Sequence, residues 1–348
     1  MTIVISILGL ILLIVIHELG HMLTAKAVGV RVPEFGVGFG PPVFRKKFGK
    51  TIYSFRIILL GGFAKMAGMG DGETGPGTYY DKSAWRRAAI IFAGPLANFV
   101  AAVAILAGVF MFSGVITGAT NEVREVVPGS MAASVGIEAG DRIVSVDGQP
   151  VADWEDFTSV VSEKRPGDAA SLVVATGGEE QTLNGTLQAS PDDPERGLVG
   201  VSPEPIRETY GFVESVGMAF SQIGQIMVAL AGFIGQLITG QESFYDNVTG
   251  PVGIVSVSSE SVTQGIYPVL LAFISLNLAV FNLLPILPLD GGHLLFIALE
   301  KVFRRPISEA TMNKVALFGM MLVLTLFLFA TYADLSKLFT GQPFIPDQ

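Results

Sequence analysis

Residues 1–25 read MTIVISILGLILLIVIHELGHMLTA, an apolar run interrupted only by His17, Glu18 and His21. A run of this length can cross the hydrocarbon core of a bilayer as a helix. A cleaved signal peptide typically has a basic start and an apolar stretch of about 7–15 residues, whereas this run has no basic start and continues further. We therefore interpret it as a permanent span.

The remainder of the chain also has the composition of a membrane protein. Of its 348 residues, 50% are hydrophobic and only 15% are charged, which is unusual for a soluble enzyme of this length. Three further stretches contain no Asp, Glu, Lys or Arg and are long enough to span a bilayer: residues 88–112, 267–289 and 315–333. The sequence therefore predicts a mainly α-helical core of four transmembrane helices.

The charges of the loops predict an orientation. Residues 26–87 contain eleven Lys/Arg and four Asp/Glu, and residues 300–314 contain four and two, whereas residues 113–265 contain six and twenty-one. Because short basic loops stay on the cytoplasmic side, we expect both termini and the long acidic segment to lie outside. The net charge of −9 argues against a nucleic-acid partner.

The outer segment contains a predicted soluble domain at residues 121–203. β-rich runs at 142–146 and 171–175 alternate with Gly and Pro turns, and residues 154–163 have helical spacing. The domain resembles a PDZ domain, and three stretches carry the resemblance: PGSMAA (128–133), GDRI (140–143) and VDG (146–148). It implies a groove that takes an extended peptide as an added strand. The alternative is a small β-domain that only packs against the membrane core.

Residues 204–266 link this domain to the third predicted span. Within them, residues 210–239 have apolar side chains at helical spacing, which predicts an amphipathic helix lying on the membrane surface. A fifth span is the alternative there, and Gln222 and Gln225 count against it.

The predicted chemistry lies in the sequence HELGH at residues 17–21. On a helix, His17 and His21 share one face, so both imidazoles can bind one Zn²⁺, and Glu18 lies beside that face as a candidate general base. Two imidazoles and a carboxylate in an apolar span are costly unless they are paired or bind something. The alternative is a hydrogen-bonded polar cluster that holds helices together.

A catalytic zinc requires a third protein ligand and an open coordination position. The chain has no cysteine, so any metal must be held by His and carboxylate side chains. Asp290 ends an uncharged span, follows the helix breakers Pro285 and Pro288, and precedes two glycines that allow a sharp turn. We therefore predict Asp290 as the third ligand. For His293 we expect a supporting or structural role rather than ligation.

Three motifs together resemble those of the site-2 protease family: HELGH (17–21), GPLAN (94–98) and NLLPILPLDGGH (282–293). With one PDZ domain between the second and third spans, their order further resembles the bacterial branch that contains the regulator-of-sigma-E protease. The resemblance implies a zinc metalloprotease that cuts proteins inside the bilayer. Its site residues would be Glu18 as general base and His17, His21 and Asp290 as zinc ligands.

The resemblance also implies where a substrate lies. Asn277 and Asn282 would line the substrate channel, whereas for Asn98 we expect a hydrogen bond to a neighbouring helix rather than a substrate contact. Residues 49–66 resemble the family's membrane-associated β-hairpin, which pairs with an unwound substrate strand near Gly61 and Gly62. The alternative is an ordinary cytoplasmic hairpin.

The implied substrates are single-span membrane proteins, namely trimmed anti-sigma factors or signal-peptide remnants. Cleavage would take place near the cytoplasmic side of a bacterial cytoplasmic (inner) membrane, with the multi-pass core surrounded by membrane lipid. The PDZ domain would contact substrate ends or act as a size filter. The predicted parts are an N-terminal membrane core (1–120), the PDZ domain (121–203), the linker (204–266) and a C-terminal membrane core (267–348).

Two other classes of protein could carry part of this pattern. A metal transporter could place His and Asp in its spans, but it would not need Glu18 beside His17. It would also commonly show internal repeats, which are not visible here. A catalytically inactive PDZ scaffold would be expected to lack at least one of the four site residues, and all four are present.

Overall fold

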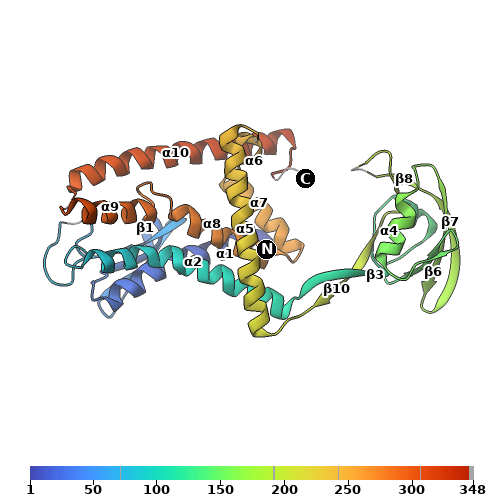
Figure 1. Ribbon diagram of the computed structural model, residues 1–348, viewed down its shortest axis with the longest axis horizontal. Helices are drawn as coiled ribbons and strands as arrows, with labels where there is room; N and C mark the ends of the chain where they lie inside the picture. The colour runs from blue at the N-terminus through green and yellow to red at the C-terminus, as the bar shows by residue number, and fades with distance from the viewer. Residues whose placement is uncertain (71, 191–192, 242, 306, 345–348) are drawn as a thin grey trace. The chain divides into compact units, whose positions relative to one another are not determined.

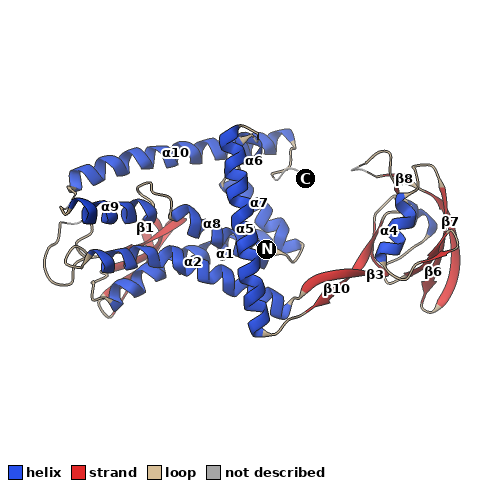
Figure 2. Ribbon diagram, in the orientation of Figure 1, coloured by secondary structure: helices blue, strands red, loops and turns tan. Residues whose placement is uncertain are grey.

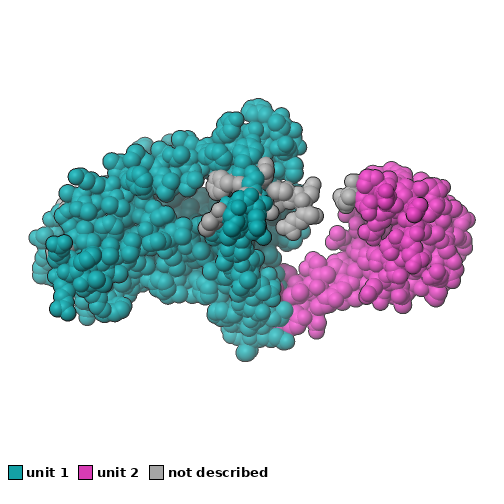
Figure 3. Space-filling model, turned by 45° about the horizontal axis from the view of Figure 1, so that its top comes forward, with its two compact units in different colours: residues 1–109, 212–348 teal, residues 110–211 magenta. Residues whose placement is uncertain are grey.

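The computed structural model describes residues 1–344 except 71, 191–192, 242 and 306, and it divides into two compact units (Figure 3). Met1–Val109 and Phe212–Gln348 together form the first, which we call the membrane unit. Phe110–Gly211 forms the second, the inserted unit. The inserted unit therefore begins about eleven residues before and ends about eight residues after the predicted PDZ bounds, because the strands that connect it belong to it.

The membrane unit is built on long apolar helices (Figures 1 and 2). Among the described residues, four helices are long and apolar enough to cross a membrane by length and composition. They are α1 (Thr2–Ala27), α2 (Ala84–Phe112), α5 (Phe212–Thr239) and α10 (Glu309–Thr340). The predicted class, a helical membrane core of four spans with an inserted β-rich domain, is confirmed.

The third predicted span, residues 267–289, is not one continuous helix. Helix α8 (Tyr267–Asn282) has 16 residues and is therefore about 24 Å long, short of the roughly 30 Å of a bilayer core. Residues 283–289 are unwound, and α9 (Asp290–Phe303) follows. The predicted break is confirmed, since Pro285 and Pro288 cannot donate helical hydrogen bonds. Asp290 begins a helix rather than ending one.

Helix α5 covers almost all of the helix that we predicted for residues 210–239. It runs unbroken for 28 residues, and Phe212–Leu237 has a mean hydropathy of 1.5, which makes it a candidate span. Gln222 and Gln225 do not prevent this, because an uncharged amide costs far less in a bilayer than a charge does. In Figure 1, α5 runs across the direction shared by α1, α2 and α10. The start of α8 contacts the N-terminal end of α1, where Tyr267 donates to the carbonyl oxygen of Ser6 at 2.7 Å.

The predicted hairpin is present and is longer than expected. Strand β2 (Thr51–Lys65) pairs with β1 (Glu34–Phe48). The sequence did not suggest strand β1, because its run GVGFGPP is typical of a loop. Gly38 and Gly40 have φ of +87° and +84°, which only glycine adopts readily, and this allows β1 to bend. As a result Glu34–Val37 lies in register with both ends of β2.

Close packing of α1 on α2 and β2 forms the core around the site. A Cβ at Gly20 of α1 would overlap the carbonyl oxygen of Ala93 in α2, so the two helices approach at a distance that only glycine allows. A buried apolar cluster lies beside this crossing: Met22, Ala25, Val30, Val32, Phe35, Met66, Tyr79, Ile90, Ile91 and Ile297. The crossing fixes α1, which carries HELGH, against α2, which carries GPLAN.

Two further helices connect α5 to α8. The short α6 (Phe244–Asn247) precedes α7 (Pro251–Thr263), which packs against α1 and α10. The buried carboxylate of Asp334 in α10 accepts hydrogen bonds from the N–H groups of Gly250 and Gly253, at 2.9 and 2.8 Å. This carboxylate caps the N-terminus of α7 and joins the last helix to the centre of the unit.

The inserted unit is a sheet with two short helices. Its strands are β3 (Val115–Val126), β4 (Arg142–Val146), β5 (Gln149–Pro150), β6 (Ala169–Thr176), β7 (Glu179–Thr186), β8 (Gln188–Ala189), β9 (Gly197–Leu198) and β10 (Val201–Glu208). The main sheet has the order β10-β3-β4-β6-β7, with β5 on β4, and β8 pairs with β9. Helices α3 (Met131–Val135) and α4 (Trp154–Ser162) complete it around one apolar core. The predicted strands and helix of this domain are present.

The connection after this domain differs from the prediction. We expected the linker to begin at residue 204, but residues 201–208 form β10, which pairs antiparallel with β3. The two chain segments that join the inserted unit to the membrane unit therefore form a two-stranded ribbon. A hydrogen-bonded ribbon is stiffer than a single flexible linker.

Candidate metal centre

Helix α1 presents two histidines on one face. His17 and His21 are four residues apart, and their rings meet edge to face with centroids 4.8 Å apart. Their Nε2 atoms are 3.2 Å apart. The Nδ1 of His21 is 2.9 Å from the carbonyl oxygen of Ile90, to which it donates, so Nε2 is left as the lone-pair nitrogen.

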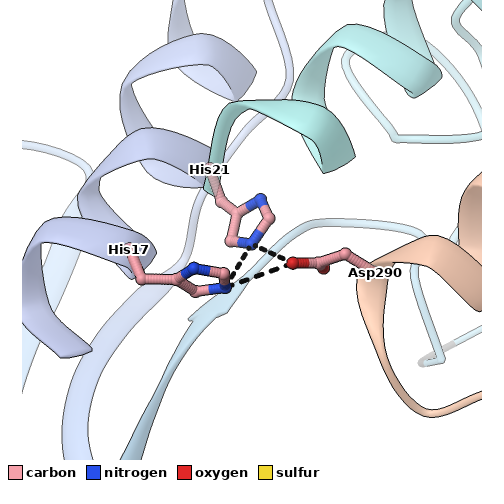
Figure 4. Close-up of side chains that lie close together, drawn as sticks. All are labelled: His17, His21 and Asp290. Carbon is pink, nitrogen blue, oxygen red and sulfur yellow. Dashed lines mark hydrogen bonds and ion pairs between the residues drawn. The ribbon is translucent and has the colours of Figure 1, made fainter. Parts of the chain in front are cut away.

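Asp290 reaches the same point from the N-terminus of α9 (Figure 4). Its Oδ2 is 3.2 Å from His17 Nε2 and 3.4 Å from His21 Nε2. The side chains of His17, His21 and Asp290 are largely buried, and together they form a group of three metal-type donors among the described residues. Segments more than 260 residues apart in the sequence thus supply one cluster.

The three donor atoms have the spacing that a tetrahedral zinc site requires. With zinc–ligand distances of about 2.0–2.2 Å, the ligand atoms of a tetrahedron lie roughly 3.3–3.6 Å apart. The three observed separations are 3.2, 3.2 and 3.4 Å. In addition, Asp290 Oδ2 is buried and no described group donates a hydrogen bond to it. A buried acceptor oxygen without a donor that faces two imidazole nitrogens is costly unless a cation lies between them, so the residues fit zinc.

Gly94 of α2 allows this cluster to form. A Cβ at that position would overlap His21 Nε2 and would lie 2.9 Å from His17 Cε1. No role for Gly94 was predicted from the sequence, although a small residue in an apolar helix is a signal for close helix packing. Asn98, one turn further along α2, is fully buried with its Nδ2 3.4 Å from His17 Nδ1. It contacts a site histidine rather than serving only to join helices.

Glu18 of α1 packs against the last part of β2. A Cβ at Gly62 would lie 3.0 Å from Glu18 Cγ, so Gly62 leaves room for this carboxylate beside the histidines. Gly61 has a φ of +122°, and a Cβ there would meet the ring of Phe39. Of the two glycines predicted to contact substrate, Gly62 therefore lies against the predicted general base.

The other predicted residues are not part of the donor cluster. Asn282 ends α8 and donates from Nδ2 to the carbonyl oxygen of Leu278 at 2.9 Å. Asn277 has a buried Oδ1 with no described hydrogen-bond donor. His293, one turn after Asp290, lines a cavity of about 290 Å³ with Leu287 and residues of α10. It is not among the three clustered donors.

Gly291 and Gly292 have a role different from the one we predicted. We expected them to form a sharp turn, but both lie in the first turn of α9 and neither has a positive φ. A Cβ on Gly291 would overlap Leu283 O, and one on Gly292 would lie 2.6 Å from Ile286 C. The glycines are needed because the unwound residues 283–289 fold back directly against the helix that carries Asp290.

Comparison with known proteins identifies the family of the chain. The family model described as peptidase family M50 matches residues 5–326. A protein named as a zinc metalloprotease in Agrobacterium fabrum is 33% identical over 361 residues, covering 95% of each chain. The zinc metalloprotease RasP of Shouchella clausii is 30% identical over 413 residues, covering 94% of this chain and 97% of RasP.

Solved structures match the inserted unit. The PDZ domain of an SdrC-like protein from Listeria monocytogenes is 22% identical and covers 26% of this chain and 92% of that chain, with a TM-score of 0.22. A solution structure from Geobacillus thermodenitrificans is 32% identical and covers 24% of this chain and 95% of that chain, with a TM-score of 0.22. Because the family model spans most of the chain and the relatives are matched over almost their whole length, the chain belongs to peptidase family M50, the site-2 proteases, and is a membrane zinc metalloprotease.

Proposed function

We propose that this protein cleaves single-span membrane proteins within the bilayer, with zinc held by His17, His21 and Asp290 and with Glu18 as the general base. The observation that carries the proposal is the triangle of donor atoms, 3.2–3.4 Å on each side, in apolar helices. Intramembrane proteolysis is the activity of the family in general. The ligand roles, the substrates and the topology are the parts that we propose.

Zinc bound there would supply Lewis-acid polarisation of the scissile carbonyl and would lower the pKa of water towards neutrality. The residues of the chain perform the proton transfers. Glu18, beside the donor cluster and against Gly62, accepts the proton of the attacking water and returns it to the leaving amine. The half-buried side-chain amides of Asn277 and Asn282 can donate to the developing oxyanion or to the extended peptide.

The sheet edge beside Glu18 suits an unwound substrate. A transmembrane helix hides its peptide groups in internal hydrogen bonds, so a protease must first open it. Strand β2 brings Gly61 and Gly62 to α1, where an extended peptide could add as a further strand and present its carbonyl next to Glu18.

The position of the histidines along α1 agrees with cleavage near the cytoplasmic side. With the N-terminus outside, the end of α1 at Ala27 lies at the cytoplasmic surface. His21 is six residues before that end, a rise of about 9 Å. We propose that the protein is a multi-pass protein of a bacterial cytoplasmic membrane, with both termini and the PDZ domain on the outer side.

We infer that the substrates are trimmed anti-sigma factors or signal-peptide remnants, in keeping with the bacterial branch that the motifs resemble. Both are single spans with a short outer end. The PDZ domain, inserted between α2 and α5, would read or exclude that end. A single span without a bulky outer domain is also the kind of segment that can move laterally through lipid to the site.

A co-expression assay with a trimmed single-span substrate tests this function. We expect Glu18→Gln to retain zinc and to lose proteolysis by about 10²–10⁴-fold, because the amide cannot take the proton of water. Glu214→Gln, the same change on an exposed residue of α5, is the matched control and should cleave normally. Wild-type cleavage by Glu18→Gln would refute its role as the base, and full zinc in Asp290→Ala would remove Asp290 from the ligands.

A further inference from the structure

Asn98 has an unusual environment for a residue of an apolar helix. It is fully buried in α2, and its main-chain oxygen accepts a hydrogen bond from Ser275 Oγ of α8 at 2.8 Å. Its side-chain nitrogen Nδ2 is 3.4 Å from His17 Nδ1. Its side-chain oxygen Oδ1 is buried and no described group donates to it.

This orientation of the amide conflicts with zinc ligation by His17. An amide nitrogen only donates, so His17 Nδ1 would have to accept, and the imidazole proton would lie on Nε2. That nitrogen, however, faces Asp290 Oδ2 at 3.2 Å and His21 Nε2 at 3.2 Å, where a ligand must present a lone pair. Rotation of the amide by 180° removes the conflict, because Oδ1 then accepts from Nδ1–H and His17 Nε2 carries the lone pair.

His21 already shows the corresponding arrangement. Its Nδ1 is 2.9 Å from the Ile90 carbonyl oxygen, and its Nε2 points to Asp290. Ile90, Gly94 and Asn98 lie at intervals of four residues, so they form one stripe along α2 that faces the two imidazoles. On this stripe the carbonyl oxygen of Ile90 orients His21, and Gly94 makes room for both rings. The amide of Asn98 contacts His17.

We propose that Asn98 is a positioning residue for His17, which accepts a hydrogen bond from Nδ1–H through Oδ1 and thereby holds Nε2 in the form that binds zinc. The inference rests on the proposed role of His17 as a ligand. Partners that fix the tautomer and orientation of a metal-binding histidine typically change metal affinity by about 10–100-fold when they are removed.

Zinc affinity of the purified full-length chain tests the proposal, measured by competition with a chromogenic chelator. Asn98→Leu should weaken zinc binding by about 10–100-fold, because the leucine fills the site but cannot accept. Asn98→Asp should bind zinc within about threefold of the wild type or more tightly, because a carboxylate is an acceptor only. Ser275→Ala is the matched control, since it removes the contact to the main chain of Asn98 and leaves the amide in place.

Three outcomes separate this inference from the proposed ligand set. Wild-type affinity in Asn98→Leu, together with lost zinc in His17→Ala, would overturn the role of Asn98 alone. Full zinc in His17→Ala would instead overturn the ligand set. If Asn98→Asp binds as weakly as Asn98→Leu, the amide acts as a donor and the proposal is wrong. The visible spectrum of the cobalt-substituted chain gives a second readout, which should change for Asn98→Leu and not for Ser275→Ala.

Discussion

Gly94 shows how one missing side chain determines the metal centre. The rings of His17 and His21 occupy the space where its Cβ would lie. We predict that Gly94→Ala displaces at least one imidazole and lowers both zinc occupancy and proteolysis by about tenfold or more, the size of effect seen when the supports of a metal ligand are disturbed. Elemental analysis of the purified variant measures the zinc.

Gly108 of the same helix provides the control for this prediction. No heavy atom lies within 4 Å of a Cβ built there, so Gly108→Ala should keep its zinc. Alanine is also the better helix former by about 0.5–1 kcal/mol, so its stability should not fall. Equal zinc content in the two variants would show that the space at Gly94 is not critical.

The site residues divide into those that the sequence could reveal and those that it could not. His17, Glu18 and His21 could be identified because the period of a helix fixes which residues share a face. Gly94 and the contact of Asn98 with His17 could not, because they depend on how closely α2 approaches α1. That approach is a tertiary property, set in part by Gly20, and no local spacing encodes it.

The unwound residues 283–289 are packed between two helices, with α9 on one side and α10 on the other. A Cβ at Gly319 of α10 would overlap the carbonyl oxygen of Leu287. We predict that Gly319→Ala pushes this segment towards Asp290 and destabilises the protein by about 1–3 kcal/mol, as overpacking does, with partial loss of zinc. Thermal unfolding with and without added zinc measures both effects.

A glycine in α5 gives the comparison for Gly319. Gly232→Ala introduces the same methyl group into another long helix, where no heavy atom lies within 4 Å of the Cβ. Its melting temperature and zinc content should match those of the wild type. An unchanged Gly319→Ala variant would mean that α10 can move away without consequence for the segment that carries Asp290.

The turn after β4 gives the inserted unit a dependence on pH. Asp147 accepts a side-chain hydrogen bond from Lys164 and a backbone one from Ser171, and both lower its pKa. Because the folded pKa is below the unfolded one, this carboxylate contributes stability at neutral pH that is lost as the pH falls from about 5 through the lowered pKa. The contribution is up to about 1 kcal/mol, since the pair is partly exposed to solvent.

We therefore predict that Asp147→Asn is less stable than the wild type at pH 7 and that this difference becomes smaller as the pH falls towards 3. Hydrogen exchange of β4 and β6 in the full chain measures this. Glu179→Gln changes an exposed carboxylate of β7 and should behave like the wild type at both pH values. A constant difference between Asp147→Asn and the wild type at both pH values would contradict the assignment.

Elements were predictable where their own pattern defined them. Strand β4 and helix α4 follow from local alternation and helical spacing, and both are present. Strand β1 was missed because its glycines and prolines are typical of a loop, and its pairing with both ends of β2 makes it a strand. Hydropathy alone also failed to separate α5 from residues 267–289, since both are apolar and only the prolines end α8 early.

For the molecule as a whole, the distribution of charge predicts its orientation in the membrane. The basic segment at residues 26–87 includes the hairpin of β1 and β2, with Lys46 near its turn. A reporter that works only in the cytoplasm should therefore be active when it is placed at Lys46. A reporter that works only outside the cytoplasm should be active when it is fused after Gln348. The opposite pattern would reverse the orientation and place the histidines near the outer surface.

The inserted unit can be removed cleanly because its two connections are paired. In the ribbon of β3 and β10, Val123 lies opposite Pro203 and Ala119 opposite Pro205, so a short linker can join residue 120 to residue 203. The deletion of residues 121–202 leaves His17, Glu18, His21 and Asp290 unchanged. Whether the PDZ domain excludes long substrates or recruits trimmed ones can therefore be tested on an intact metal centre.

We predict that the deletion variant cleaves a trimmed substrate at a near-normal rate and also accepts an untrimmed one. An acidic segment, with twenty-one Asp/Glu against six Lys/Arg at residues 113–265, suits a domain that excludes bulky outer regions. A recruiting domain would give the reverse, namely slower cleavage of the trimmed substrate and none of the longer one. The same deletion with Glu18→Gln controls for other proteases. A zinc-loaded deletion variant that still rejects the untrimmed substrate would rule out exclusion by size, because no other domain would remain to impose it.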